Sequence, residues 1–238
     1  MLNLNPFALP TFIPGKALSM PVVYFNDFLT GVTEDGETFS TTADKGEFLV
    51  SADTLDAATQ NPFVQDDQDG GVVKTTTDAT SGERISSQLN GENFYMTRGR
   101  QLYFEARLKF TNTTQDAVFG ISVNTTDPHA SAPSDYVLFG LTGDADIQYG
   151  VATGSSDSGA YSGTDSTADL VADTWTTFAF WYDGTDSVRF YVDGSEVGLK
   201  STNLPLDKYM SPVLCVESNG AAEALFIDYI LVANERGR

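Results

Sequence analysis

WTTFAFWYDGTDSVRFYVDG, residues Trp175–Gly194, carries the clearest structural signal in this chain. It contains two apolar, aromatic-rich runs, Trp175–Tyr182 and Val188–Val192, and each run is followed by Asp-Gly. Asp-Gly between strand-like runs predicts a hairpin, because both central residues of a type I′ turn need a positive φ. Large side chains fall on both faces of the first run, which is typical of a strand inside a stack of sheets. We therefore expect this hairpin to lie in the middle of a two-layer β-protein.

Further strand-like runs lie on both sides of this hairpin, and no segment with a helical period competes with them. The most regular run is 101–111, which alternates apolar and polar side chains. Residues 153–174 are rich in Ser, Gly, Thr and Asp and read as a long surface loop. The sequence therefore predicts an all-β fold, a two-sheet antiparallel jelly-roll sandwich. The other expected strands are 22–28, 48–51, 72–77, 117–123, 135–141, 147–151, 210–217 and 224–233.

The 238 residues suit one such domain, which we expect to span 22–238, preceded by an extended proline-rich N-terminal arm over 1–21. Prolines at positions 6, 10, 14 and 21 forbid a regular helix or a central strand in the arm. The arm packs across its own domain or docks on a neighbouring subunit, and the sequence leaves both readings open. Its expected anchors are its large apolar side chains, Leu2, Leu4, Phe7, Leu9, Phe12 and Ile13.

The chain is strongly acidic, with a formal net charge of −20 at pH 7. Such a charge repels phosphate backbones and anionic membranes, so neither nucleic acid nor a membrane is an expected partner. The first fifteen residues carry no Lys or Arg, and no apolar stretch reaches transmembrane length, so the sequence predicts neither a classical export signal nor a membrane span. The single cysteine, Cys215, lies in an apolar run and reads as a buried core residue.

No catalytic residue or metal ligand is predicted. The only histidine, His129, falls in a Pro/Ser/Ala segment and reads as an exposed loop residue without a recognisable partner. The acidic turn around 66–71 fails the EF-hand spacing, since Gln65 and Thr76 would occupy the first and last ligand positions. No cofactor is expected, with adventitious Ca²⁺ binding a weak alternative. No phosphate loop, zinc spacing or dinucleotide fingerprint occurs.

The Trp175–Gly194 stretch and the closing run Phe226–Val232 resemble concanavalin A-like (laminin-G-like) jelly rolls. Some members of that superfamily are β-glucan hydrolases with a Glu-x-Asp-x-(x)-Glu strand, which places alternate carboxylates on one face. This chain has no such run, so it is not expected to be an enzyme. Other members are lectins, and the resemblance therefore implies a carbohydrate-binding module for host or glycan attachment as the alternative function. Its possible glycan contacts are Tyr136, Tyr149 and Tyr161, near loop aspartates such as Asp135.

A narrower resemblance is to virion proteins of tailed bacteriophages, carried by Tyr24–Phe28 and Gly70–Thr75. It implies a non-enzymatic structural protein that decorates or cements the capsid exterior through its N-terminal arm. The major capsid protein or other virion subunits are the implied partners, and a homo-oligomer is possible. A tail-fibre role is disfavoured because the sequence has no coiled-coil or repetitive segment.

Overall fold

The computed structural model describes residues 21–27, 42–45, 47–52, 61–65, 71–154 and 160–236. All regular elements in these residues are β-strands, and none of the described segments forms a helix long and apolar enough to cross a membrane. The strands are β1 (Pro21–Asn26), β2 (Thr42–Lys45), β3 (Phe48–Ala52), β4 (Asn61–Gln65), β5 (Val73–Thr76), β6 (Arg84–Leu89), β7 (Phe94–Met96), β8 (Leu102–Phe110), β9 (Asp116–Ser122), β10 (Tyr136–Leu141), β11 (Asp146–Ala152), β12 (Thr164–Asp169), β13 (Thr176–Tyr182), β14 (Val188–Val192), β15 (Ser195–Lys200), β16 (Lys208–Glu217) and β17 (Ala224–Glu235).

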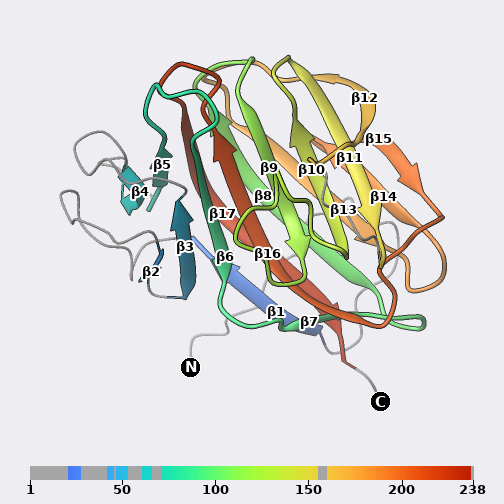
Figure 1. The fold of residues 1–238 in the computed structure, drawn as a ribbon. Helices are drawn as coiled ribbons and strands as arrows, with labels where there is room; N and C mark the ends of the chain where they lie inside the picture. The colour runs from blue at the N-terminus through green and yellow to red at the C-terminus, as the bar shows by residue number, and fades with distance from the viewer. Residues whose placement is uncertain are drawn as a thin grey trace, which may run out of the picture.

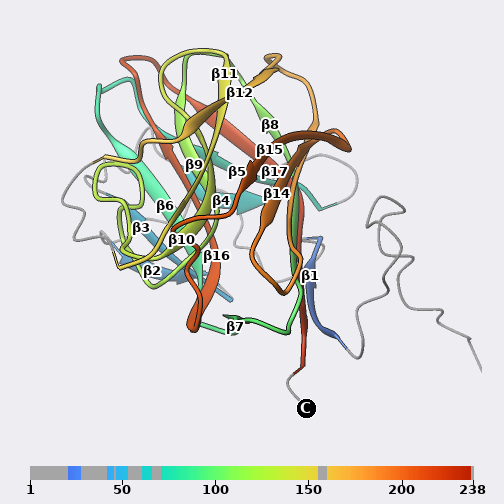
Figure 2. The ribbon, with the colours of Figure 1, turned by 90° about the vertical axis from the view of Figure 1, so that its right-hand side faces the viewer.

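The strands form two antiparallel sheets packed face to face (Figures 1 and 2). Sheet one has the order β15-β14-β13-β8-β17-β5-β4, and β1 pairs with the second half of β17. Sheet two has the order β12-β11-β10-β9-β16-β6-β3-β2, and β7 pairs with the start of β16. Figure 2 shows sheet two on the left and sheet one on the right. The predicted two-sheet antiparallel sandwich is thus confirmed.

The central hairpin forms with one difference in its turns. β13 pairs with β14 through the five-residue loop 183–187, in which the Asp183 carboxylate accepts the backbone N–H of Thr185 at 2.8 Å. The two-residue turn falls instead at Asp193-Gly194, where φ is 47° and 78° and Val192 pairs with Ser195. This second Asp-Gly therefore makes the type I′ hairpin, between β14 and β15.

The core lies between the sheets and is rich in phenylalanine. β13 carries apolar side chains on both faces, as expected, since Phe178, Phe180 and Tyr182 point into the core while Ala179 and Trp181 face outward. The Phe178 ring lies 4.7 Å from the ring of Phe119 in the opposite sheet, in an edge-to-face arrangement. Such interlocking rings hold the two sheets in one relative position.

Several expectations need correction or lie outside the described residues. The predicted loop 153–174 contains β12, whose burial pattern is mostly exposed, so its polar composition conceals an edge strand. β6, β7 and β15 were not expected from the sequence, because they lack a clean apolar alternation. The predicted anchors of the arm, residues 2–13, lie outside the described residues, and the domain boundaries stay a prediction.

Truncation of Phe178 tests the central role of this core. Its ring also contacts Phe110 and Phe139, with ring centroids 6.2 and 5.5 Å away. Phe178→Ala is expected to lower the free energy of unfolding by about 3–5 kcal/mol, because it leaves a cavity between the sheets. Urea unfolding measures this loss. Val171→Ala is the control, since Val171 is 60% exposed and its truncation is expected to change stability by less than about 0.5 kcal/mol. Similar losses for the two variants would contradict the packing described here.

Candidate functional site

The outer face of sheet two is covered at its centre by segments of the chain itself. The outward positions of β10 are Tyr136, Leu138 and Gly140, and the ring of Tyr161 lies over them. A Cβ on Gly140 would lie only 2.2 Å from Cε1 of Tyr161, so the ring occupies the space left by this glycine. The Tyr161 hydroxyl donates to the Leu138 carbonyl at 3.4 Å. The middle of this face is therefore apolar and filled, and β10 carries no carboxylate there.

The three tyrosines proposed as glycan contacts are all buried. Tyr136 and Tyr161 belong to the cluster over β10, with ring centroids 5.9 Å apart. Tyr149 belongs to the main core, where its ring lies 4.9 Å from that of Phe190. Their exposed fractions are 6%, 4% and 9% for Tyr136, Tyr161 and Tyr149, so these rings do not form a shared open platform for a sugar.

Asp135, which the sequence places among possible sugar or calcium ligands, is buried with both carboxylate oxygens occupied. Oδ1 accepts from Gly154 N–H and from Thr153 Oγ1, each at 3.0 Å. Oδ2 accepts from Ser134 Oγ at 2.7 Å and lies 3.3 Å from Lys208 Nζ. Burial alone would raise the pKa of Asp135, but these hydrogen bonds prevail and lower it. This carboxylate therefore fixes the loop at 153–154.

A row of charged side chains crosses one end of sheet two. In the strand registers, Glu217 of β16 lies directly opposite Arg84 of β6 on one side and Asp116 of β9 on the other. Arg84 Nε donates to Glu217 Oε2 at 2.7 Å, and Arg84 also pairs with Asp127 from the loop between β9 and β10. The sequence alone does not predict this row, because only the pairing of β6, β9 and β16 makes these residues neighbours.

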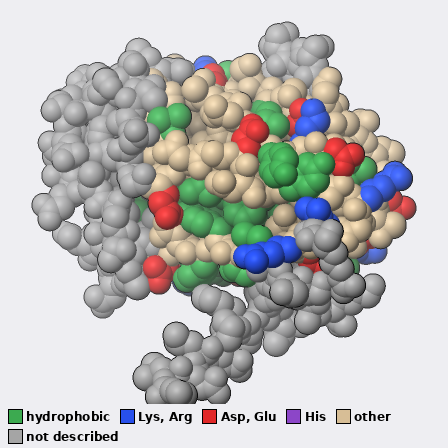
Figure 3. Space-filling view, turned by 90° about the horizontal axis from the view of Figure 1, so that it is seen from below, with side chains coloured by type: hydrophobic (Ala, Val, Ile, Leu, Met, Phe, Trp, Pro, Cys, Tyr) green, Lys and Arg blue, Asp and Glu red, His purple; other side chains and the backbone are tan. Residues whose placement is uncertain are grey.

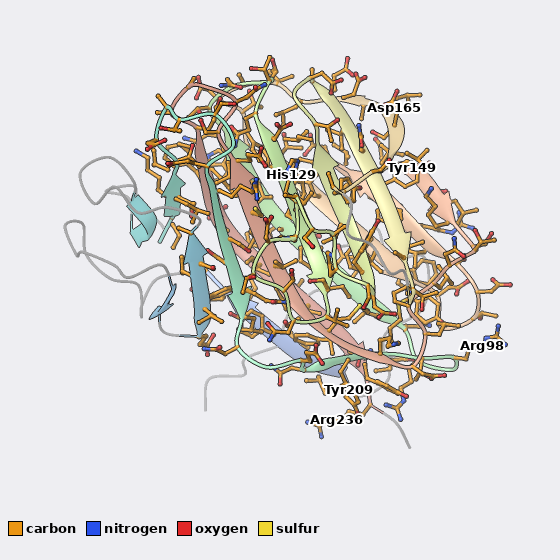
Figure 4. All side chains as sticks on the ribbon, in the orientation of Figure 1. Arg98, His129, Tyr149, Asp165, Tyr209 and Arg236 are labelled. Atoms are coloured by element: carbon orange, nitrogen blue, oxygen red, sulfur yellow. The ribbon has the colours of Figure 1, made fainter. Side chains whose placement is uncertain are left out.

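His129 joins this row, and the expectation of an exposed histidine without a partner is wrong. Its side chain is buried, and Nδ1 lies 2.6 Å from Glu217 Oε2 (Figure 4). The loop between β9 and β10 folds back onto the outer face of sheet two, which brings His129 and Asp127 over the strand ends. Cys215 of β16 is buried, as predicted, and belongs to the apolar cluster that also contains Tyr136 and Tyr161.

Two carboxyl groups of this row, those of Asp116 and Glu217, have pKa values that shift in opposite directions. Burial raises the pKa of Asp116, and the neighbouring Glu217 charge adds to the rise, while His129 opposes it. Burial also acts to raise the pKa of Glu217, but His129 and Arg84 outweigh it and lower the value. Two neighbouring carboxyl groups whose pKa values are pushed apart are an arrangement that acid–base catalysis uses. Here, however, Arg84 and His129 already occupy the Glu217 carboxylate, so the cluster holds the loop in place.

Replacement of Glu217 tests this holding role through its pH dependence. Because the folded-state pKa lies below the ordinary value of 4.5, ionised Glu217 stabilises the fold above that pH, and the contribution is lost as the pH falls through the folded value. Glu217→Gln is expected to cost about 1–2 kcal/mol near neutral pH and progressively less in acid, measured by urea unfolding at several pH values. Asp173→Asn, at an exposed carboxylate, is the control. A cost that is independent of pH would contradict the account.

The outer face of sheet one has a different character, with an apolar patch around one buried carboxylate. It is formed by outward-facing residues of β8, β13, β14 and β17, which the strand registers place side by side. Glu105 lies at its centre and accepts hydrogen bonds from the hydroxyls of Tyr103 and Tyr229, the latter at 2.6 Å. Burial, with the Glu105 charge adding, raises the pKa of both phenols, so they stay hydroxyl donors. We call this patch the sheet-one face: Tyr103, Glu105, Ala179, Trp181, Tyr191, Tyr229, Leu231 and Ala233.

β1 borders the sheet-one face and exposes apolar side chains. Val22, Val23 and Phe25 are 40%, 37% and 41% exposed, and they make up half of the large hydrophobic side chains that are exposed in the described residues. Val23 lies opposite Ala233, and Phe25 lies opposite Leu231 with its ring 5.9 Å from that of Tyr229. Among the described strands, β1 pairs only with β17. The apolar character of the face therefore continues onto an edge strand.

A third feature lies at the end of the sandwich that carries β7 (Figures 3 and 4). Tyr209 and Tyr95 are cross-strand partners with ring centroids 4.4 Å apart, and Tyr209 is 54% exposed. The Arg100 guanidinium lies 5.6 Å from the Tyr95 ring centroid, and the Tyr95 hydroxyl donates to Asp207 at 3.3 Å. Figure 3 shows hydrophobic side chains and several Lys or Arg side chains gathered on this end. Unlike the three buried tyrosines, this pair offers an open ring face.

The described residues contain no group of three or more His, Cys, Asp or Glu side chains that could hold a metal ion. The model of the concanavalin A-like lectin/glucanases superfamily, of the Laminin_G_3 kind, matches residues 90–225. The chain belongs to this superfamily. The match covers β7 to β16, so the resemblance read from the sequence is confirmed at this level. A comparison with the curated proteins finds no match.

Several solved structures share the fold of this chain at low sequence identity. An endo-1,3-β-glucanase from Streptomyces sioyaensis is 14% identical with a TM-score of 0.59, covering 93% of this chain and 99% of that one. A protein of unknown function from Shewanella oneidensis MR-1 is 16% identical with a TM-score of 0.56, covering 94% and 92%. A seed lectin from Lotus tetragonolobus is 10% identical with a TM-score of 0.55, covering 82% and 96%. At such identities these likenesses establish the fold alone.

Proposed function

We propose that this protein is a non-enzymatic structural protein of a virion. It decorates the exterior of a tailed-bacteriophage capsid and stabilises the shell by burying additional interface against capsid subunits. The contacts come from the N-terminal arm, with Leu2, Leu4, Phe7, Leu9, Phe12 and Ile13 as anchors, and from β1, into which the arm leads. The narrower sequence resemblance to tailed-phage virion proteins supports the choice of assembly.

The observation that carries this proposal is the exposed apolar surface of β1. Half of the large exposed hydrophobic side chains in the described residues lie on this one edge strand, directly after an arm rich in apolar residues. An exposed apolar edge strand is a hazard in an isolated protein, and natural sheets usually protect such edges. If a partner binds along this edge, it covers the apolar side chains of β1, and the exposed edge is then no longer a hazard.

The two outer faces support a binding role without chemistry. The centre of the sheet-two face is filled by Tyr161, and the Glu217 carboxylate beside Asp116 is occupied by Arg84 and His129. A glycosidase needs two carboxyl groups that reach a substrate in an open cleft. The high negative charge of the chain suits a protein displayed densely on a particle, because it opposes aggregation between particles.

Charged substitutions on β1 test the proposal. Val23→Asp and Phe25→Asp are expected to weaken binding to purified capsid shells by at least about tenfold, which corresponds to about 1.4 kcal/mol. Deletion of residues 1–20 is expected to abolish binding, because it removes the anchors. Co-sedimentation of the purified protein with shells that lack it measures the affinity, and circular dichroism checks that each variant is folded.

The matched control is Val171→Asp, which places the same charge at a side chain that is 60% exposed and distant from β1 in the sheet order. This control is expected to bind shells like the unmodified protein. If the β1 variants and the deletion variant also bind normally, attachment through this edge is refuted.

A second candidate function is glycan binding for host attachment, and the open tyrosine pair Tyr95–Tyr209 favours it. An exposed aromatic face can stack on the apolar side of a pyranose ring, while Asp207 and Arg100 beside it can bond sugar hydroxyls. The superfamily includes lectins, which agrees with this reading.

The glycan reading is tested on a glycan array followed by titration of any bound sugar. Tyr209→Ala is expected to weaken the binding of such a sugar at least about tenfold, since it removes the stacking face. Leu199→Ala truncates another exposed apolar side chain and is expected to leave binding unchanged. An array without any bound glycan, or equal binding by the two variants, would count against this second function.

A further inference from the structure

The sheet-one face is apolar although it points away from the core. Its residues alternate along β8 with the core residues Leu102, Phe104 and Ala106, so Tyr103 and Glu105 must face outward. Tyr103, Ala179, Leu231 and Ala233 are nevertheless at most 6% exposed. The one carboxylate of this patch, Glu105, accepts from two tyrosines. The ion pairs Arg107–Asp228 and Arg189–Glu196 border the patch, since Arg107 lies opposite Tyr229 and Arg189 opposite Trp181. Trp181 and Tyr229 are only partly buried, so they are the side chains of this face that an added apolar segment would cover.

We propose that the N-terminal arm of the same chain, through its apolar residues 2–13, packs on the sheet-one face in the unassembled protein. Residues 1–20 contain no acidic residue and a single basic one, Lys16. The arm is therefore the one long part of this acidic chain that the negative charge of the sandwich does not repel. Its large side chains, among them Phe7 and Phe12, match the aromatic character of the face.

The path of the chain places the arm beside this face. β1 begins at Pro21, opposite Glu235 of β17, and β17 lies between β1 and β8. From β1 to β13 the face spans three strand spacings, or about 14 Å. Eight residues separate Ile13 from Pro21, and an extended chain of that length reaches about 26 Å. The arm can therefore cross the whole face without moving β1.

The tether favours the chain's own arm over that of a second copy. A segment joined to the rim of its binding site by a short linker experiences an effective concentration on the order of millimolar. A second copy at ordinary protein concentrations would have to overcome both this advantage and the repulsion between two chains of charge −20. Docking within one chain keeps the arm's anchors and the apolar face covered until the arm is transferred to a partner.

Trp181 provides a spectroscopic probe, because it is partly buried at the sheet-one face. The chain has only one other tryptophan, so Trp175→Phe leaves Trp181 as the sole reporter. In this background, deletion of residues 1–20 is expected to shift Trp181 emission to longer wavelength and to increase its quenching by acrylamide. Phe7→Ser with Phe12→Ser in the full-length chain is expected to do the same, which guards against a folding defect of the truncated form.

The matched control is Asn3→Ser with Asn5→Ser, which changes polar residues of the same arm and is expected to leave the emission unchanged. The emission of the full-length protein is expected to be independent of protein concentration. Emission that does not respond to the deletion or to the phenylalanine changes would overturn the proposal. Emission that shifts on dilution would overturn it as well, because the covering arm would then belong to a second copy. The experiment uses no capsid, so its failure is distinct from a failure of shell binding.

Discussion

The packing of phenylalanine rings between the two sheets is the interaction on which the rest of the structure depends. Phe178 in sheet one and Phe119 in sheet two interlock edge to face, and neighbouring rings extend the contact in both directions. Because this core holds the two sheets face to face, the surface of the sandwich consists of two outer faces and its ends. The functional question is therefore which of these outer surfaces remains available to another molecule.

The two faces give different answers. On sheet two, the loop between β9 and β10 and the segment around Tyr161 lie against the strands, and the Glu217 cluster ties that loop to three strand ends. Carboxylates brought together there bind cationic side chains of the protein itself. On sheet one, the apolar face and the exposed edge strand β1 lie side by side. Half of the large hydrophobic side chains that are exposed in the described residues lie on this side of the molecule, on β1.

Much of the fold follows from the sequence, because the period of two is strong wherever one face of a strand is buried. The run around Phe104 is of this kind, whereas the runs around Phe178 and Ile230 are apolar on both faces; the sequence places all three in strands. β12 and β15 are edge strands with polar or mixed side chains, so their pairing depends on neighbours rather than on local pattern. The type I′ turn at Asp193-Gly194 could have located β15, since the same signal was used at Asp183-Gly184.

The candidate sites follow from the sequence much less well. The Arg84, Asp116 and Glu217 row depends on the registers of three strands that are far apart in the chain, and His129 joins it only through the path of a loop. Aromatic residues are equally ambiguous, because alternation does not say whether the outward position of a strand will be covered. Tyr161 is buried over a glycine, whereas Tyr209, near the start of β16, is exposed. The local sequences around the two tyrosines do not predict this difference.

Hydrogen–deuterium exchange of the protein, free and bound to capsid shells, tests the central claim of attachment through the sheet-one side most directly. The account predicts that binding increases protection of residues 21–27 in and after β1 and leaves the exchange of the loop between β9 and β10 unchanged. Increased protection of that loop, with no change at β1, would contradict it by placing the partner on the outer face of sheet two.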